Sequence, residues 1–547
     1  MRSSRFGFVF VLALVLLGLP AACATPTPTA TPRPTATPTP TASPLPIFTT
    51  QPATGSATLA APAAPEHLDV HQAASDVLLS MGPGIVYSRL LRLRTGPGAP
   101  SPSLEVECDL CQAWEQTSPT TYVFHLRQGV RWQDVPPLNG RVLTAQDVTY
   151  SLDRLRTPGW PGAALLQAVA SVQASDDRTV QVTLRYADAD FPLALAHGQS
   201  KIVAKEAVEQ HGDLKAGPAI GTGPWVLEAS GPEGSQYSAN PSYFEPGVPG
   251  LERLRIQVVG EASTRMILVL VGRVDVTVLD DRAWETLRGM SDETRVMSGV
   301  FPLPGTGLLL GLQAIKPPFD RLEVRQALYQ SLHPWKALAT PGWEGRGEVQ
   351  AGSPPASVDW KLSQEEMQAY FGDSAKAQTL LAQSGVKTPV AFTLSLADFG
   401  DKYLVLGNAY ADMMRQAGFQ PALETLNPRE YADQVWNRRD FQAFLGPMPP
   451  VYSPNGFLVG MAHSQGQYAI TGYVNPELDA LILRQFSAGD DREELVRQTQ
   501  RLMLQKAFLF MPASGVSLWM WREHVQGFAP NLGASEYFYW AKMRVGE

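Results

Sequence analysis

Two of the three cysteines, Cys108 and Cys111, have a spacing at which thiols bind metals or close small disulfide rings. A structural zinc site needs about four ligands, and this sequence places neither a second cysteine pair nor a histidine nearby. We therefore expect no metal at this position. In an exported protein the two thiols can form a disulfide. Two buried free thiols are the alternative, and the spacing leaves both interpretations open.

Other residues with catalytic potential do not form a recognisable site. The sequence contains no nucleophile elbow, no His-Glu-x-x-His motif and no phosphate-binding P-loop. Residues 305–311 come within one position of the dinucleotide-binding fingerprint, but the third glycine is misplaced and the run is apolar, as in a strand. His463 precedes Ser464, but a base and a nucleophile that are adjacent in sequence rarely act together. We predict no enzyme activity and no cofactor; a secreted hydrolase and a passive adhesion protein are the alternatives.

The first 23 residues have the features of a lipoprotein export signal. Two arginines precede a mostly apolar run, Phe6–Leu19, which is too short to span a bilayer because a span takes about 20 residues. Small residues then lead to Cys23, which cleavage would expose for diacylation. A plain secretory signal is the alternative, since Pro20 stands where the bacterial cleavage motif prefers leucine. We predict a signal peptide over residues 1–22 and a lipid anchor on Cys23, at the outer face of the cell membrane or in the periplasm.

Residues 23–65 combine the lipidated cysteine with a tether rich in threonine and proline. Thr-Pro repeats cannot pack a core and favour the extended polyproline II conformation. At about 3.1 Å per residue, such a tether reaches on the order of 100 Å. It would lift the following domain clear of the membrane surface, unless it is a spacer with no further role.

Composition excludes several classes of protein. The chain of 547 residues is 44% hydrophobic and 18% charged, as in a globular protein, and the length after the tether exceeds one usual core. The formal net charge is −8 and no basic run is present, which argues against nucleic-acid binding. We expect a monomer with two or three domains.

Residues 122–155 predict a strand, a turn and a helix. Tyr122, Phe124 and Leu126 stand at every second position, which is the period of a half-buried strand. Thr144–Asp147 has the spacing of a capping box, and apolar residues at helical intervals follow it up to Leu155. Further strand patterns over 180–186, 254–258 and 516–520 alternate with helical patterns near 262–271 and 412–417. This alternation favours the α/β class.

The order of residues in this block resembles the family 5 solute-binding proteins of ABC importers, the peptide- and nickel-binding group. Members carry a strand ending in Leu-Arg, a Gly-Val turn with an aromatic residue, and Thr-Ala-x-Asp-Val opening a helix; here these are Leu126-Arg127, Gly129-Val130 with Trp132, and Thr144–Val148. Other blocks that resemble the family follow in its order: Gly221–Trp225, Asn240–Phe244, Gly272–Asp275, Pro317–Leu328 and Asn475–Asp479. Together they span nearly everything after about residue 66.

The resemblance implies a two-lobed periplasmic-binding-protein-like fold of type II, with an extra subdomain and a ligand cleft flanked by a hinge. The implied parts are a first lobe of residues 66–110, 218–305 and 515–547, an added subdomain of residues 111–217, and a second lobe of residues 306–514. The implied function is a membrane-anchored receptor that delivers a small ligand, a peptide or another solute, to the permease subunits of an ABC importer. A sensor lipoprotein that presents its ligand to a signalling partner would use the same fold.

The resemblance also indicates where the sequence departs from the peptide-binding members. In those proteins an acid in a segment of the form Asp-Tyr-x-Asp/Glu-Pro pairs with the α-ammonium of the ligand. The matching segment here is residues 449–458, where Pro450 falls at the position of the amine-binding acid and Ser453 replaces the acid before proline. A peptide with a free amino terminus would meet no counter-charge there. Sugars, blocked peptides, opines and metal chelates are therefore candidates beside ordinary peptides.

Eight residues are candidate ligand contacts through the same resemblance: Tyr452, Ser453, Asn455, Phe457, Trp343, Trp521, Ser75 and Asp76. The aromatic rings can stack on a sugar or cover an apolar group, and their alternative role is core packing. Ser453 and Asn455 can supply neutral hydrogen bonds or merely cap the turn that contains Pro454. Asp76, from the opposite wall, can replace the missing acid.

Overall fold

The computed structural model describes residues 53–547 apart from 291–294, 353–359, 488, 490 and 547. The predicted signal peptide, the lipidation site Cys23 and most of the tether lie outside the described residues. Within the described part of the chain, no helix combines the length and the apolar character needed to cross a bilayer.

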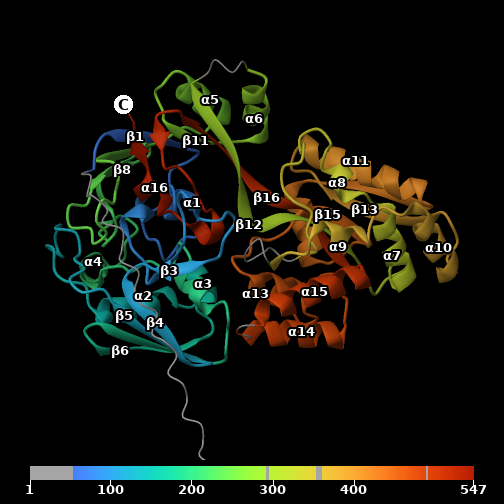
Figure 1. The fold of residues 1–547 in the computed structure, drawn as a ribbon, viewed down its shortest axis with the longest axis horizontal. Coiled ribbons are helices and arrows are strands. Elements are labelled where there is room, and N and C mark those ends of the chain that lie inside the picture. Colours follow the sequence, from blue (N-terminus) through green and yellow to red (C-terminus); the bar gives the residue numbers. More distant parts are fainter. Residues whose placement is uncertain (1–52, 291–294, 353–359, 488, 490, 547) are drawn as a thin grey trace, which may run out of the picture. The chain divides into compact units, whose positions relative to one another are not determined.

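One mixed sheet of ten strands is the main element of the fold (Figure 1). Its strands are β1 (Ser56–Ala61), β8 (Trp225–Gly231), β9 (Gly234–Ala239), β10 (Arg253–Val258), β11 (Val276–Leu279), β12 (Val296–Leu312), β13 (Val390–Ala397), β14 (Phe419–Leu426), β15 (Ala443–Pro447) and β16 (Leu509–Arg522). Their order across the sheet is β14-β13-β15-β12-β16-β11-β1-β10-β9-β8.

Strand β1 corrects the predicted end of the tether at residue 65. It pairs in parallel with β10 on one side and β11 on the other, and Ala57, Leu59 and Ala61 are buried. The six residues of β1 include no proline, so each amide is free to join the ladder. The chain therefore enters the folded domain by residue 56. This is before residue 65, where the end of the threonine- and proline-rich composition suggested that the tether stops.

The two longest strands, β12 and β16, connect the first lobe with the second. They pair antiparallel from Val296 to Gly311 of β12. At one end β16 pairs with β11, and at the other end β12 pairs with β15. The lobe boundaries predicted at residues 305 and 514 fall inside these two strands and stay predictions. Neither strand belongs to one lobe alone, which is the arrangement expected of a hinge.

The buried apolar residues group on the two sides of these strands. The largest cluster draws on residues 57–256, Val276 and 519–543, which overlap the ranges predicted for the first lobe and the added subdomain. Two other clusters draw only on residues 308–513, in the second lobe. A small fourth cluster covers the helices that follow β10. Separate cores allow the two lobes to move as bodies about the strands that join them.

A second sheet confirms the elements predicted for residues 122–155. Its four strands run in the order β4-β5-β7-β6, with bounds β4 (Cys111–Ser118), β5 (Thr121–Leu126), β6 (Val169–Asp176) and β7 (Thr179–Leu184). Tyr122, Phe124 and Leu126 are buried on one face of β5. Helix α2 (Ala145–Leu155) begins with the predicted capping box, in which the Thr144 backbone N–H donates to the Asp147 carboxylate at 2.9 Å.

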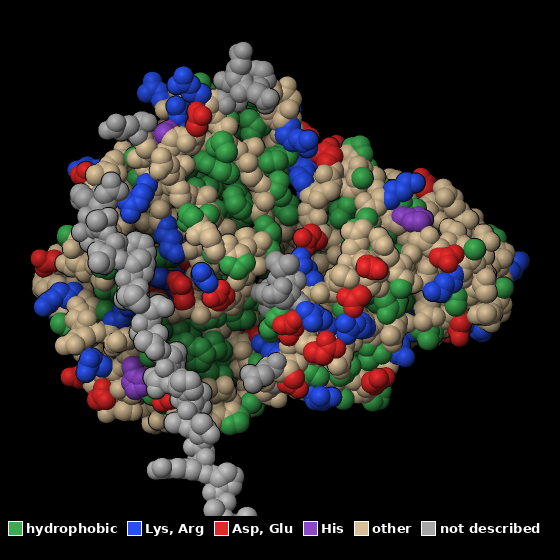
Figure 2. Space-filling view, in the orientation of Figure 1, with side chains coloured by type: hydrophobic (Ala, Val, Ile, Leu, Met, Phe, Trp, Pro, Cys, Tyr) green, Lys and Arg blue, Asp and Glu red, His purple; other side chains and the backbone are tan. Residues whose placement is uncertain are grey.

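The remaining elements are mostly short helices. They are α1 (Asp76–Leu79), α3 (Phe191–Ala196), α4 (Lys205–His211), α5 (Ala262–Leu270), α6 (Asp281–Arg288), α7 (Leu322–Ser331), α8 (Pro334–Ala337), α9 (Gln364–Gln368), α10 (Ser374–Ser384), α11 (Asp401–Gln416), α12 (Pro428–Tyr431), α13 (Pro454–Phe457), α14 (Pro476–Ser487), α15 (Arg492–Lys506) and α16 (Tyr539–Lys542), with the short strands β2 (Leu91–Leu93), β3 (Val106–Cys108), β17 (Val525–Gln526) and β18 (Arg544–Val545). Acidic and basic side chains are interspersed over α14 and α15 (Figure 2), where Arg501 pairs with Glu494 and Glu366.

Candidate ligand-binding cleft

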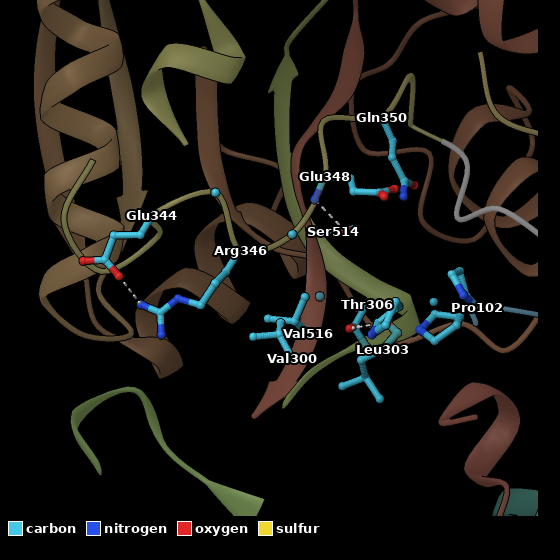
Figure 3. Close-up of a pocket in the computed structure, with 16 residues that line it drawn as sticks. Pro102, Val300, Leu303, Thr306, Glu344, Arg346, Glu348, Gln350, Ser514 and Val516 are labelled. Carbon is cyan, nitrogen blue, oxygen red and sulfur yellow. Dashed lines mark hydrogen bonds and ion pairs between the residues drawn. The ribbon is translucent and has the colours of Figure 1, made fainter. Parts of the chain in front are cut away.

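A cavity of about 300 Å³ lies where β12 and β16 meet residues 344–350 of the second lobe (Figure 3). Pro102 of the first lobe closes it from another side. Small-molecule sites typically occupy clefts of this size, at places where domains meet. Because its walls come from both lobes and from the strands between them, this cavity would change shape when the lobes move.

Two larger hollows, of about 680 and 650 Å³, are lined differently. The first is lined by residues 335–497 and therefore lies within the second lobe. The second is lined by residues 114–192 and 360–493, which belong to the added subdomain and the second lobe. Neither includes a residue of β12 or β16, so we take the cavity beside these strands as the candidate cleft.

The cavity opens where the ladder between β12 and β16 is interrupted. The register shifts between Pro302 and Gly307, in a stretch that also contains Pro304. Proline has no N–H to donate to a ladder, so pairing cannot continue through this stretch. Gly305 has a φ of 80°, and a Cβ there would lie 1.6 Å from the carbonyl oxygen of Val451. Only glycine fits this turn, which lies at the register shift and lines the cavity.

Residues 344–350 are fixed against β16 by backbone hydrogen bonds. The amide of Gln350 donates to the Met511 carbonyl at 2.9 Å, and the Met511 amide donates back at 3.0 Å. The Ser514 amide donates to the Glu348 carbonyl at 2.8 Å, and the Glu348 amide donates to Ser514 Oγ at 3.0 Å. Gly347 has a φ of 83° and lies so close to the Ser514 carbonyl that a Cβ would contact it at 2.6 Å. The polar wall is therefore held in place before any ligand arrives.

Every charged side chain that lines the cavity has a partner of opposite charge within the protein. The guanidinium of Arg346 is buried and contacts Glu285 at 2.7 Å and Glu344 at 3.4 Å. Glu348 pairs with Lys361. The cavity therefore presents neither a spare anion nor a spare cation among the described residues.

Apart from Nη1 of Arg346, which lies 3.7 Å from the Asp281 carboxylate but makes no hydrogen bond, the unpartnered polar group of this wall among the described residues is the amide of Gln350. The side chain is 5% exposed, and its Oε1 has no hydrogen-bond partner among the residues described. Leaving a buried acceptor unpaired costs about 1–3 kcal/mol. The opposite walls are apolar, with Val300, Leu303 and Val516 facing the hollow in Figure 3. The arrangement suits a ligand with an apolar body and a hydrogen-bonding group.

None of the eight candidate contacts named from the sequence lines this cavity. Ser453 is the N-cap of α13, where its Oγ accepts from the Gly456 amide at 3.2 Å. Phe457 is fully buried in a core cluster of the second lobe. The Tyr452 ring meets the edge of His197 at 5.6 Å, and burial, followed by the charges of Asp188 and Asp190, raises the pKa of its hydroxyl. These placements correspond to the capping and packing alternatives rather than to ligand contact.

Asn455 joins the second lobe to the added subdomain. Its backbone N–H donates to Asp190 at 2.7 Å, and its Nδ2 donates to Asp188 at 2.9 Å. Its Oδ1 accepts from Gln485 at 2.9 Å and from Arg492 at 3.1 Å. Arg492 also pairs with Asp190 at 2.5 Å. We call these five residues the clasp. Its side chains are buried or half-buried, and its central amide is fully hydrogen-bonded.

The other candidate contacts also lie outside the cavity. Trp343 donates its indole N–H to the Lys402 carbonyl at 3.0 Å and is 5% exposed. Trp521 packs against Phe528, with ring centroids 5.2 Å apart. Ser75 is the N-cap of α1, and Asp76 at the start of that helix is exposed. As ligand contacts, all eight stay predictions.

The two cysteines for which a disulfide and two free thiols were both open lie at the ends of β3 and β4. The structure joins Cys108 and Cys111 through their sulfur atoms, with the Cα atoms 5.0 Å apart. Whether the exported protein carries this bond is checked by alkylating its thiols before and after reduction. Elsewhere among the described residues, no group of three or more His, Cys, Asp or Glu side chains is placed to hold a metal ion.

Sequence reasoning missed the residues that do line the cavity. Arg346, Gln350 and Ser514 lie in stretches with no signature of their own, and the strand pattern that begins at Val516 carries no sign of a binding site. One local signal was available, because the Pro-Leu-Pro-Gly run of residues 302–305 interrupts a strand pattern and marks a bulge or turn.

The chain matches a known family and known folds. The family model for bacterial extracellular solute-binding proteins, family 5 (middle part), matches residues 105–469. The dipeptide-binding protein of Escherichia coli is 25% identical over 488 residues, which cover 83% of this chain and 88% of the relative. A probable di/tripeptide-binding protein of Pseudomonas aeruginosa is 24% identical over 89% of this chain and 95% of its own length. With heme-binding protein A of Haemophilus influenzae, 29% identical, the match spans about half of each chain, 55% and 56%.

Solved structures confirm the predicted two-lobed α/β fold of type II. HbpA2 from Haemophilus parasuis superposes with a TM-score of 0.77 at 21% identity, over 90% of this chain and 100% of that one. The unliganded open form of MppA, a periplasmic murein tripeptide binding protein, gives a TM-score of 0.76 at 18% identity, over 90% and 97% of the chains. These relatives are binding proteins rather than enzymes. This chain belongs to family 5 of the bacterial extracellular solute-binding proteins.

Proposed function

We propose that this protein is a membrane-anchored receptor that captures a small ligand in the cavity beside β12 and β16 and delivers it to the permease subunits of an ABC importer. The observation that carries the proposal is the origin of the cavity walls. They include Pro102 from the first lobe, both connecting strands, and residues 344–350 from the second lobe. A ligand in this position contacts both lobes at once.

Such a ligand would stabilise the closed arrangement of the lobes. Since β12 and β16 run through both lobes, a small change in these strands reorients one lobe against the other. A ligand that contacts both lobes binds the closed form better than an open one, and this difference in affinity drives closure. Release at the transporter then requires only that the permease favour the open form.

The relatives indicate which solutes to test. Their names cover dipeptides, a murein tripeptide and heme, and another structural neighbour was solved with mannopinic acid. Thermal unfolding of the full-length protein in detergent, with panels of peptides, sugar-derived opines, metal chelates and heme, separates these classes. A ligand at 100 times its dissociation constant stabilises the protein by about 2.7 kcal/mol.

A large side chain in the cavity tests the location. We expect Val300→Trp to abolish the stabilisation by any solute found in the panel, because the indole would fill the hollow. Val300 and Val474 are both exposed, at 37% and 67%, so either variant should fold. Val474 does not line the cavity, and Val474→Trp is the matched control. Retention of ligand binding by Val300→Trp would show that the ligand lies elsewhere.

The anchor is tested by removing its acceptor. We expect Cys23→Ser to move the protein from the membrane fraction to the soluble fraction, since stable attachment needs the acyl chains on this residue. Cys108→Ser is the control, because it also replaces a cysteine by serine but leaves the lipidation site unchanged. If Cys23→Ser remained in the membrane fraction, the lipid-anchor proposal would be wrong.

A further inference from the structure

We propose that the cavity selects ligands whose polar group is an uncharged amide, such as a peptide with a blocked amino terminus, over the corresponding free peptide. This inference rests on the proposed function and names the class of ligand for the same cavity. Three features carry it: the paired charges of the cavity, its unpartnered amide, and the engagement of Asp188 and Asp190 in the clasp.

The first feature is the absence of a spare counter-charge. An ammonium group that leaves water needs an anion or several acceptors, and an unpaired buried charge is far more costly than an unpaired amide. Glu344 lines the cavity and could act as the counter-charge of an ammonium group, but it already contacts Arg346 and Arg288, each at 3.4 Å. Glu348 is paired with Lys361. An ammonium group near either acid would therefore share a carboxylate that already has a cationic partner.

The second feature is Gln350. Its carboxamide is buried, its backbone is fixed against Met511 on both sides, and its Oε1 has no partner in the described structure. A primary amide carries both an acceptor and a donor, so its natural complement is a group that carries both as well. A peptide bond or an acylated amine satisfies it without bringing a charge into the cavity.

The third feature is the clasp. Asp188 and Asp190 are the acids closest to the segment that resembles the amine-binding segment of peptide-binding relatives. Both are already hydrogen-bonded to Asn455, and Asp190 is also paired with Arg492. These two carboxylates therefore hold the protein together and are not available to an ammonium group of a ligand.

The apolar walls complete the preference. Val300, Leu303 and Val516 supply apolar surface to the lining of the cavity. An apolar side chain next to the amide would rest on them, and its burial adds to affinity without adding charge. A compact ligand with one apolar side chain and blocked ends matches this surface better than a zwitterion.

Calorimetric titration of the full-length protein in detergent tests the preference. The probes are Ala-Leu-Ala, with free ends, and N-acetyl-Ala-Leu-Ala-amide. We expect the blocked peptide to bind at least about tenfold more tightly, because the free ammonium would enter without a counter-charge. Tighter binding of the free peptide would overturn the inference and leave the proposed function in place. If neither peptide bound but another solute of the panel did, the preference for amides would also be wrong.

A charge change at Gln350 sharpens the test. We expect Gln350→Glu to reverse the preference, with a gain of about tenfold for the free peptide and a loss for the blocked one, because the carboxylate supplies the missing counter-charge. Gln383→Glu adds the same charge on the exposed surface of α10 and should change neither affinity. An unchanged preference in Gln350→Glu would contradict the role of this residue.

Asp76→Ala is the further control: if it selectively lost binding of a free peptide, Asp76 would be the counter-charge and the inference would fail.

Failure of the inference can be told apart from failure of the proposed function. If no solute of any class stabilises the wild-type protein, the receptor function itself is wrong. If solutes bind and Val300→Trp abolishes their binding, the receptor function stands, and the order of affinities for the two peptides alone decides the inference.

Discussion

The clasp and the cavity both bring together residues far apart in the sequence, but they differ in how their polar groups are satisfied. In the clasp, the amide of Asn455 makes hydrogen bonds to Asp188, Gln485 and Arg492, and the Asp190 carboxylate is paired. In the cavity, the amide of Gln350 is equally buried but its acceptor is unpaired. A buried polar group with all its partners inside the protein stabilises the fold, whereas one without a partner that lines a cavity keeps hydrogen-bonding capacity that a ligand can meet.

The largest expected effect comes from breaking the ion pair of the clasp. We expect Arg492→Met to lower the free energy of unfolding by about 3 kcal/mol or more, because the buried Asp190 carboxylate loses its counter-ion. Arg415→Met is the control, since its pair with Asp412 is exposed and should contribute less than about 1 kcal/mol. Chemical denaturation measures both. Equal small losses in the two variants would mean that the clasp is only a surface contact.

A matched substitution compares the two amides directly. We expect Asn455→Leu to cost about 2–4 kcal/mol of stability, because Asp188, Gln485 and Arg492 would each lose a hydrogen-bond partner. Gln350→Leu should be near neutral or stabilising, since it removes an acceptor that is already unpaired. Chemical denaturation of both variants without ligand measures how much unfolding free energy each one loses. A large loss in Gln350→Leu would show that its amide has a partner inside the protein.

A smaller effect is expected from the pH dependence of the clasp. Burial raises the pKa of Asp188, and the neighbouring Asp190 adds to the rise, while hydrogen bonds and the charge of Arg492 oppose it. The folded protein therefore holds this proton more tightly than the unfolded chain, so the stability contributed by Asp188 falls as the pH rises through the raised pKa. We expect Asp188→Asn to remove this part of the pH dependence.

The comparison acid for that measurement is Asp69. Burial alone would raise the pKa of Asp69, but the ion pair and hydrogen bonds with Arg154 outweigh it and lower the pKa to about 2. Its contribution to stability is therefore present above its ordinary pKa and is lost as the pH falls towards about 2. Asp69→Asn should thus change the pH dependence of the free energy of unfolding in the direction opposite to Asp188→Asn. If both variants changed the pH dependence of stability in the same direction, the environment described for Asp188 would be wrong.

Local signals in the sequence predicted local structure well. The alternation of Tyr122, Phe124 and Leu126 predicted a half-buried strand, and Thr144–Asp147 predicted a capped helix, because each signal depends on neighbours within a few residues. The order of the family-like blocks predicted the two-lobed fold. The end of the tether was misplaced because a run of alanine and threonine has no distinctive pattern until it pairs with β10 and β11.

The cavity and the clasp depend on contacts that no local pattern reveals. Asn455 and Asp188 are 267 positions apart, and nothing near Asn455 in the sequence indicates that two acids lie against it. Likewise, the cavity lies where β12 shifts register against β16 and where Ser514 of β16 is hydrogen-bonded to Glu348. Aromatic residues were named as candidate ligand contacts through the family resemblance, with core packing as the alternative, and Phe457 and Trp343 are buried.

The structure of the full-length protein crystallised with its highest-affinity ligand from the panel is the most direct test of a receptor that closes around a solute beside β12 and β16. We predict ligand density against Val300 and Val516, with a hydrogen bond to the amide of Gln350 and the clasp unchanged. Ligand density against Asn455 and Tyr452 instead, with Gln350 still unpaired, would contradict the account.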